Sequence, residues 1–310
     1  MHHRLRRVTR LKKAVLYTVL VLAVLAGSIE VLARYNMRQE QAARAYLGDR
    51  LYVQVLGQGD PVVFLAGLQA STEFWQHRFD PLARDHRLIF LDALGFGRSP
   101  WPDVRFTLDD HLGALRRTLV AKGATKNVTI VGHSFGTILA AYYAARYPEE
   151  IKRLYLVGTP VFSGEADARD RISEMSPIAA LFSLNPVFAR EGCMVMGAFR
   201  PLLRRVLPAV RSDLPPQVVS DGVLHDWDSI NGTIRNVLLT KPVAKPLAVI
   251  GRKVTFVHGR ADTITPLPRI RELAKAVGAQ VIETPDRHLS YPVRSSGTII
   301  AAIEKGGGKP

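Results

Sequence analysis

Residues 127–147, NVTIVGHSFGTILAAYYAARY, decide the fold of this 310-residue chain. The opening NVTIV is a near-continuous apolar run, which is typical of a strand buried on both faces of a parallel sheet. A helix-length apolar segment, FGTILAAYYAARY, follows it, and the turn between them reads Gly132-His133-Ser134-Phe135-Gly136. This arrangement predicts a sharp strand-to-helix turn in which side chains at 132 or 136 would clash with neighbouring backbone. Ser134 is then held in a strained conformation with its oxygen at a helix N-terminus.

The alternation of strand-like and helix-like segments continues on both sides of this turn. The β-rich runs are Leu51–Leu56, Pro61–Ala66, Arg87–Asp92, Asn127–Gly132, Arg153–Gly158, Lys253–His258 and Gln280–Glu283. Helix-length segments lie between most of them, at Ser71–Arg84, Leu108–Lys122, Phe135–Tyr147 and Pro266–Val277. Strands alternating with helices predict an α/β fold with a mostly parallel sheet covered by helices on both faces.

The alternation stops after Gly158 and resumes at Lys253. Residues 161–250 contain many prolines and apolar helical pieces but no clear strand. We therefore expect the core to comprise residues 51–160 and 251–310, with residues 161–250 inserted as a mostly helical cap.

A serine hydroxyl is a poor nucleophile, so Ser134 needs a base and an orienting acid. With a nucleophile on a strand-to-helix turn, the expected chain order is Ser, then Asp or Glu, then His. The histidines after Ser134 are His225 in the cap, His258 at a strand end and His288 after the last predicted strand. A loop after the final strand can reach back over the sheet edge, so His288 is the predicted base.

The acid is expected at the carboxyl end of the preceding strand, which selects Asp262. Asp286 competes for this role, but it is too close in sequence to His288 to support it easily. His258 is interpreted as a structural residue that holds the loop presenting Asp262.

Four motifs, taken in order, resemble the cap-bearing branch of the α/β-hydrolase superfamily, over about residues 50–160 and 251–310. Leu65–Leu68 stands where that family has His-Gly-x, and Asp92–Ser99 matches its Asp-x-x-Gly-x-Gly-x-Ser loop. Residues 132–136 match the nucleophile elbow, and His258–Asp262 match the acid-bearing His-Gly-x-x-Asp loop. The resemblance implies a Ser134–Asp262–His288 triad.

The resemblance also implies that the backbone amides of Leu68 and Phe135 form the oxyanion hole. The chain departs from the family pattern at Ala66, which replaces a histidine, at Arg287, which replaces a glycine, and at Thr137, where relatives often have glycine. The hole uses backbone N–H groups, so the change at Ala66 need not remove it.

The N-terminal segment carries a membrane signal. Residues 1–13 hold Arg4, Arg6, Arg7, Arg10, Lys12 and Lys13 without an acid, and residues 14–33 are apolar apart from Glu30. About twenty such residues cross a bilayer, and the basic arm predicts a cytoplasmic N-terminus with the catalytic domain on the other side. Residues 34–50 are interpreted as a polar stalk. Two alternatives stay open: a signal peptide cleaved before Gly27, giving a secreted or periplasmic enzyme, and a buried helix of a soluble protein.

Composition excludes several other classes. Cys193 is the single cysteine, so an intramolecular disulfide and a multi-cysteine metal site are excluded. Six of the fifteen net positive charges lie in the short arm, so the rest of the chain is only mildly basic. Neither clustered Lys and Arg with aromatic residues nor a known module predicts nucleic-acid binding. We expect no cofactor and no metal, and the sequence leaves the oligomeric state open.

Together these features predict a serine hydrolase that cleaves a carboxylic ester with an apolar or lipid-like acyl group. Lactones, thioesters and the carbon–carbon bonds cut by related hydrolases are alternatives. A hydrolase-like fold used only for binding is the non-enzymatic alternative, and the complete set of Ser134, Asp262 and His288 argues against it.

Overall fold

The core is a seven-stranded sheet, seen in a computed structural model that describes residues 2–175, 177–211 and 214–307. The strands are β1 (Val53–Leu56), β2 (Asp60–Leu65), β3 (His86–Leu91), β4 (Val128–His133), β5 (Ile151–Val157), β6 (Val254–Gly259) and β7 (Gln280–Thr284). They lie in the order β1-β3-β2-β4-β5-β6-β7, and only β1 runs antiparallel to its neighbour. The predicted α/β architecture is therefore confirmed.

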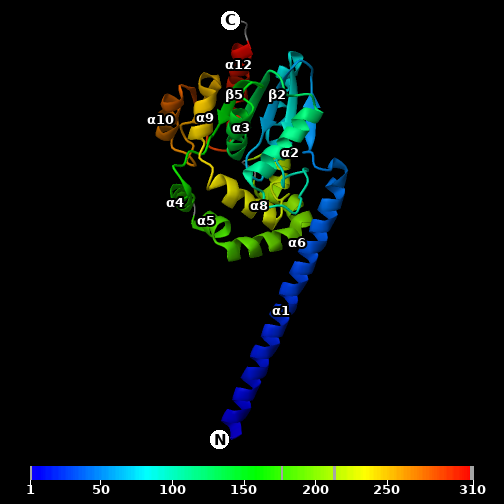
Figure 1. Cartoon of the computed structure of the whole chain (residues 1–310). Coiled ribbons are helices and arrows are strands. Elements are labelled where there is room, and N and C mark those ends of the chain that lie inside the picture. Colours follow the sequence, from blue (N-terminus) through cyan, green and yellow to red (C-terminus); the bar gives the residue numbers. More distant parts are fainter. Residues whose placement is uncertain (1, 176, 212–213, 308–310) are drawn as a thin grey trace.

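Helices cover both faces of the sheet (Figure 1). One face packs on α2 (Leu108–Ala121), α3 (Phe135–Arg146), α9 (Ala244–Ile250) and α10 (Leu267–Val277). The other face packs on the 3₁₀ helix η3 (Gln76–Arg84) and on α11 (Tyr291–Arg294) and α12 (Ser296–Gly307). Alternate residues of a strand serve the two faces: Val63 lies in the first apolar cluster and Phe64 in the second.

The expected helix at Ser71–Arg84 forms differently. The structure has two 3₁₀ helices there, η2 (Thr72–Phe74) and η3, and the second contains Pro81. Proline removes a backbone donor and its ring crowds the preceding turn, which accounts for the lack of a regular α-helix.

Between β5 and β6 the described residues form helices and no strand. The helices are α4 (Glu165–Met175), α5 (Pro177–Leu184), α6 (Pro186–Val210), α7 (Pro216–Asp221), α8 (Trp227–Thr233), the π-helix η4 (Ile234–Leu238) and α9. We call residues 161–250 the cap. Residues 176 and 212–213 of this expected insertion, residue 1 of the arm and residues 308–310 of the core lie outside the described residues.

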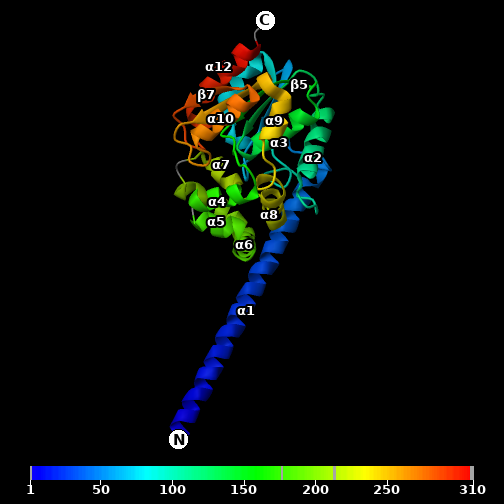
Figure 2. The same ribbon diagram turned by 60° about the vertical axis from the view of Figure 1, so that its left-hand side comes forward.

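The N-terminal helix α1 (His2–Arg44) runs without a break through the expected arm, membrane span and most of the stalk. Its last part packs on the cap. Ala33 is buried and lies beside Gly197 of α6, where a Cβ at 197 would be 3.5 Å from Cβ of Ala33. The side-chain amide of Asn36 donates to the carbonyls of Gly197 and Ala198 at 3.0 and 2.9 Å. Figures 1 and 2 show the rest of α1 extending away from the domain.

The end of the expected stalk is fixed to the core by Arg44. Its guanidinium is buried, donates to the carbonyl of Gly97 and stacks 4.4 Å from the ring centroid of Trp101. Polar residues 34–44 therefore connect the apolar part of α1 rigidly to the domain. The 3₁₀ helix η1 (Ala45–Leu47) follows and leads into β1.

Candidate active site

Ser134 stands on the turn between β4 and α3, as the sequence predicts. Its φ of 50° lies in the left-handed region, which non-glycine residues rarely adopt and which marks strained functional positions. A Cβ at 132 would lie 2.7 Å from the Gly136 carbonyl oxygen, and a Cβ at 136 would lie 2.2 Å from the Leu65 carbonyl oxygen. Both glycines are thus sterically required for the sharp turn that exposes the serine.

The structure brings Ser134, His288 and Asp262 together although they are far apart in the sequence. Nε2 of His288 lies 2.9 Å from Oγ of Ser134, and Nδ1 of His288 lies 2.9 Å from Oδ2 of Asp262. Because the carboxylate accepts the proton on Nδ1, Nε2 is left as the acceptor for the serine hydroxyl. This geometry suits general-base activation of the serine.

The carboxylate of Asp262 is buried and held in a fixed direction. Its Oδ1 accepts from the Ile264 and Thr265 amides at 2.9 and 3.4 Å, and its Oδ2 accepts from Tyr291 and His288. Burial raises the pKa of Asp262, but hydrogen bonding and charge interaction with His288 and the Tyr291 hydrogen bond outweigh it and lower the pKa to about 2. The group is therefore a carboxylate at neutral pH.

Two residues that sequence reasoning left without a role support this arrangement. The buried Tyr291 hydroxyl donates to Asp262 at 2.7 Å and accepts from the amide of Gly259 at 2.8 Å. The buried His133 donates from Nε2 to the carbonyl of His288 at 2.7 Å, so it holds the loop that carries the base. The position of His133 inside the turn motif was a usable signal, whereas no pattern marked Tyr291.

The other candidate acid and the strand-end histidine lie outside this hydrogen-bonded chain. Asp286 is buried, but its carboxylate accepts from the hydroxyls of Ser290 and Ser295. His258 donates from Nε2 to the carbonyl of Thr265 at 2.8 Å, across the loop that contains Asp262. This contact agrees with the structural role expected for His258.

The departures from the family pattern are accommodated locally. Thr137 donates its hydroxyl to the carbonyl of Ser134 at 2.6 Å, a bond common in the first turn of a helix. Arg287 is exposed on the outer side of the His288 loop, and its amide donates to the Ser290 hydroxyl at 3.0 Å.

The loop that follows β2 passes directly beside Ser134. A Cβ at Gly67 would lie 3.0 Å from Nδ1 of His133 and 3.3 Å from Cβ of Ser134, so glycine avoids two tight contacts at this approach. Leu68 comes next and lines the same cavity as Ser134, while Phe135 is the first residue of α3. The two predicted oxyanion-hole residues thus lie near Ser134, Leu68 on the loop after β2 and Phe135 at the start of α3.

The cap holds this loop in place. Gln69 has a φ of 61°, and its side-chain amide donates to Nε2 of His225 at 2.6 Å. Two residues on, the hydroxyl of Ser71 donates to the buried carboxylate of Asp221 at 2.8 Å. Both partners come from the cap segment around α7, so the cap and the proposed oxyanion loop are mechanically connected.

A cavity of about 370 Å³ opens onto Ser134 and His288. Its walls are mostly apolar and come from the core and from α6, α7 and the segment between them. The lining residues include Phe74, Leu207, Arg211, Leu214, Val218 and Leu289. An apolar group attached to a carbonyl carbon at Ser134 would be shielded from water here.

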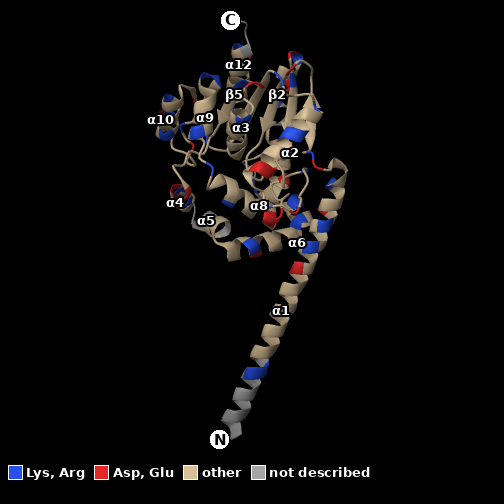
Figure 3. Ribbon diagram, viewed as in Figure 1, with Lys and Arg blue, Asp and Glu red and all other residues tan. Residues whose placement is uncertain are grey.

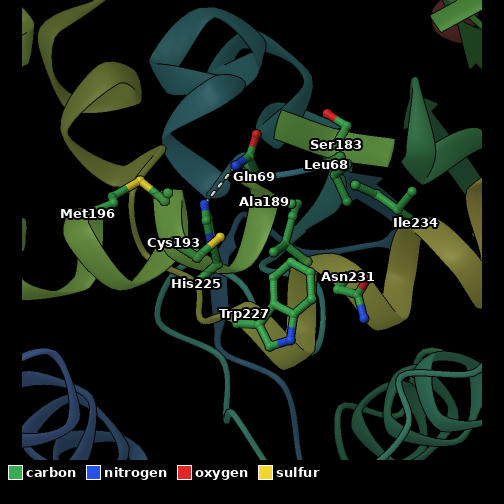
Figure 4. Close-up of a pocket in the computed structure, with 12 residues that line it drawn as sticks. Leu68, Gln69, Ser183, Ala189, Cys193, Met196, His225, Trp227, Asn231 and Ile234 are labelled. Atoms are coloured by element: carbon green, nitrogen blue, oxygen red, sulfur yellow. Dashed lines mark hydrogen bonds between the residues drawn. The ribbon is translucent and has the colours of Figure 1, made fainter. Parts of the chain in front are cut away.

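A second cavity of about 370 Å³ lies inside the cap on the other side of Leu68 and Gln69 (Figure 4). Figure 4 shows Cys193 and Met196 of α6 and Trp227 of α8 around it, with the Gln69–His225 hydrogen bond at its edge. Burial raises the pKa of the Cys193 thiol to about 11, so this cysteine is a protonated apolar lining group at neutral pH.

Three buried histidines near the nucleophile predict acid lability. Burial lowers the pKa of His111, His133 and His225 to about 4, 3 and 4, whereas the unfolded chain has histidine pKa values of about 6.5. Below pH 6.5 the unfolded state therefore binds about three more protons, and stability falls as the pH falls. Together the three histidines lower the stability by about 3 kcal/mol from pH 6.5 to about pH 5.5. The buried Asp92, whose pKa burial raises to about 7, offsets about 1 kcal/mol of this because it takes up a proton in the folded state. We therefore expect urea unfolding of the full chain in detergent to show a net loss of about 2 kcal/mol.

The matched variant for this prediction is His225→Gln. It should reduce the loss by about 1 kcal/mol, because one proton-linked group is removed. Stability that is constant between pH 7 and 5.5 would contradict the prediction.

No group of three or more His, Cys, Asp or Glu side chains in the described part of the chain is arranged to hold a metal ion.

Comparison with known proteins agrees with this fold. A family model described as the alpha/beta hydrolase fold matches residues 60–177. The chain is 38% identical over 109 residues to "Probable lysophospholipase BODYGUARD 2" of Arabidopsis thaliana, covering 33% of this chain and 23% of that protein. It is 34% identical over 118 residues to "Cis-3-alkyl-4-alkyloxetan-2-one decarboxylase" of Shewanella oneidensis, covering 37% of each. The chain thus spans between about a quarter and two fifths of the length of these curated relatives.

A solved structure, the enol-lactonase from Burkholderia xenovorans LB400, superimposes with a TM-score of 0.63 at 18% identity and covers 83% of this chain and 95% of its own. This similarity extends the shared fold beyond the segment matched by the family model. The sheet, the strained turn and the matched motifs define a protein of the α/β-hydrolase fold. Residues 60–177 match the α/β-hydrolase family model, and the chain shares the α/β-hydrolase fold with the solved structure over most of its length.

Proposed function

We propose that this protein is a membrane-anchored serine hydrolase that cleaves a carboxylic ester with an apolar or lipid-like acyl group. The observation that carries the proposal is the hydrogen-bonded chain from Asp262 through His288 to Ser134. Its terminal hydroxyl lies on a strained turn and faces an apolar cavity. The name of a relative, a probable lysophospholipase, supports a lipid-like substrate.

In the proposed mechanism, Oγ of Ser134 attacks the ester carbonyl carbon while Nε2 of His288 takes the hydroxyl proton. Asp262 stabilises the resulting imidazolium. The carbonyl oxygen becomes an oxyanion, for which the amides of Leu68 and Phe135 are the proposed donors. One such donor typically contributes about 2.7–4 kcal/mol to transition-state stabilisation. His288 then protonates the leaving alkoxide, and the acyl group remains on Ser134.

The second half of the reaction reverses these roles. Water attacks the acyl-enzyme as His288 removes its proton, and the tetrahedral intermediate collapses to a carboxylic acid and free Ser134. Covalent labelling with a fluorophosphonate tests for the activated serine, and a panel of esters with increasing acyl length then tests the substrate class. If the probe did not label the protein and no ester were cleaved, the results would favour the non-catalytic binding role.

A lactone is the second candidate substrate. One solved relative is named an enol-lactonase, and a lactone presents the same carbonyl carbon to the serine. Including lactones of matched size in the ester panel distinguishes the two, because the proposed ester hydrolase should prefer the open-chain substrate.

Residues 14–33 of α1 are the proposed anchor. The apolar helix has a window of mean hydropathy 2.3 that makes no buried contact with the domain. Figure 3 shows no charged residue in α1 between Lys13 and Glu30. At 1.5 Å per residue, these twenty positions span about 30 Å, which matches a hydrocarbon core. The basic arm supports a cytoplasmic N-terminus.

The anchor predicts retention in the membrane. After a carbonate wash, the expressed protein should remain in the membrane fraction with its N-terminal sequence intact. The reason is that the apolar helix would span the bilayer, so the wash would not release it. A mature soluble chain beginning near Gly27 would instead establish a cleaved signal peptide. A soluble chain with an intact N-terminus would contradict both readings.

A further inference from the structure

The longest cap helix, α6, carries a stripe of large apolar side chains that stay largely exposed. The stripe consists of Phe188, Val195, Phe199, Leu202, Val206 and Val210, which are 42–71% exposed. Successive members are seven, four, three, four and four residues apart, so they lie along one side of the helix. Such a row of large exposed apolar side chains marks an interaction surface.

The direction of the stripe follows from what α6 buries. Its buried residues Ala189 and Arg200 face the cap, and the guanidinium of Arg200 donates to the carbonyls of Val223 and His225. The stripe lies about 100° around the helix from these residues and about half a turn from Gly197, which faces Ala33 of α1, so it is directed away from both contacts. Figures 1 and 2 both show α6 at the end of the domain from which the apolar part of α1 extends.

The level of α6 relative to α1 is fixed by direct contacts. Ala33, at the end of the apolar segment, is buried beside Gly197 of α6, and Asn36 donates to two α6 carbonyls. The preceding residues Val31 and Leu32 are exposed. The helix α6 thus crosses α1 at the end of the apolar segment, where a bilayer that holds residues 14–33 would end.

Polar groups at this crossing match a lipid headgroup layer. Exposed Arg34 and Arg38 follow the apolar segment, and Tyr35 is 58% exposed between them. On α6, Arg190 reaches within 3.9 Å of Glu30, and Arg205 is exposed beside the stripe. Arginine pairs with lipid phosphates, and tyrosine is enriched at membrane interfaces.

We propose that the apolar stripe of α6 inserts into the surface of the phospholipid bilayer that α1 spans. This proposal rests on the anchor proposed above. An amphipathic helix of this kind lies in the interface plane with its apolar side among the upper acyl chains. Because Leu207 and Arg211 at the end of α6 line the cavity of Ser134, an apolar ester would reach that cavity from the bilayer surface.

Site-specific fluorescence tests the proposal in the full chain. Cys193→Ala removes the native thiol, and Val206→Cys then places an NBD label in the stripe. Val249→Cys is the matched control, since Val249 is an exposed valine on α9 in the half of the domain remote from α6. The labelled proteins are reconstituted into phosphatidylcholine–phosphatidylglycerol vesicles with or without lipids that carry a nitroxide near the headgroup.

We expect the nitroxide lipid to quench the label at 206 several-fold and leave the label at 249 unchanged, with aqueous iodide showing the reverse order. Equal behaviour at 206 and 249 would overturn the proposal. Protection of 206 from iodide without quenching by lipid would also overturn it, because a protein partner or second copy would then cover α6.

A third label separates this proposal from the proposals on which it depends. Val21→Cys lies in α1, and its label should be quenched by nitroxide in the bilayer centre if the anchor is correct. Quenching at 21 without quenching at 206 would support the anchor and contradict the insertion of α6. A lack of quenching at 21 would contradict the anchor and therefore also the α6 proposal. Since the readout is not turnover, it is unaffected by failure of the proposed hydrolase activity.

Discussion

Replacing Ser134 by alanine should abolish fluorophosphonate labelling and lower ester turnover by about 10⁶-fold, as loss of the nucleophile does in a serine protease. The probe forms its covalent bond with the activated serine oxygen, and alanine has no such atom. The fold should be retained, because the side chain of Ser134 makes its hydrogen bond only with His288 among the described residues and alanine occupies no additional space. Labelling on a gel and turnover of the best ester in the panel provide the measurements.

Ser163 supplies the control for this experiment. It is exposed in the cap and hydrogen-bonds locally to Asp167, so Ser163→Ala should keep both labelling and turnover. An unchanged unfolding midpoint in Ser134→Ala would show that its loss is chemical. Labelling that persists in Ser134→Ala would reject Ser134 as the nucleophile.

Asp262→Asn should lower turnover by about 10⁴-fold, the size of the corresponding effect in a serine protease. The Oδ1 position accepts two backbone amides, so the new NH₂ group must stand at the Oδ2 position, where it faces Nδ1 of His288. Two donors would then face each other unless the imidazole moves its proton to Nε2. That tautomer cannot accept the proton of Ser134, and the base is lost.

The comparison with His288→Ala shows whether the two residues act together. If they act as one unit, the double variant should be little slower than His288→Ala alone, because effects within a triad are strongly non-additive. Asp286→Asn is the control, because the Asp286 carboxylate accepts from Ser290 and Ser295. This variant should keep most of the turnover. A multiplicative loss in the double variant, or an equal loss in Asp286→Asn, would argue against the Asp262–His288 pair.

Much of the fold was predictable because it depends on sequence patterns that extend over only a few neighbouring residues. A strand buried on both faces requires a continuous apolar run, so β2, β3, β4 and β5 were recognisable from a few residues each. The turn at Ser134 was equally predictable from local sequence. Its two glycines avoid steric clashes with backbone in the same segment and in the adjacent strand. Element ends and the 3₁₀ geometry at Thr72–Arg84 were less predictable, because small differences in hydrogen bonding decide them.

The choice between Asp262 and Asp286 shows where local reasoning stops. Asp262 follows a strand end, and Asp286 lies two residues before His288. The strand position of the first and the closeness of the second to His288 favoured Asp262, without showing where either side chain points. In the folded protein, the Ile264 and Thr265 amides and Tyr291 aim Asp262 at the imidazole, while two serines hold Asp286 elsewhere. Most of these partners are near neighbours in the chain, but Tyr291 and His288 come from the segment after β7, which meets the Asp262 loop only when the sheet forms.

The sequence by itself determined the α/β class, the strained serine turn and the apolar N-terminal segment, because each depends on neighbouring residues and on burial. Tertiary structure alone decided that residues 34–44 dock on the cap, that Gln69 meets His225, and that α6 presents its apolar stripe at the end of the proposed span. The physical reason is distance along the chain. Contacts such as Asn36 with Gly197 join segments more than 150 residues apart, and the packing of the whole domain fixes their relative positions.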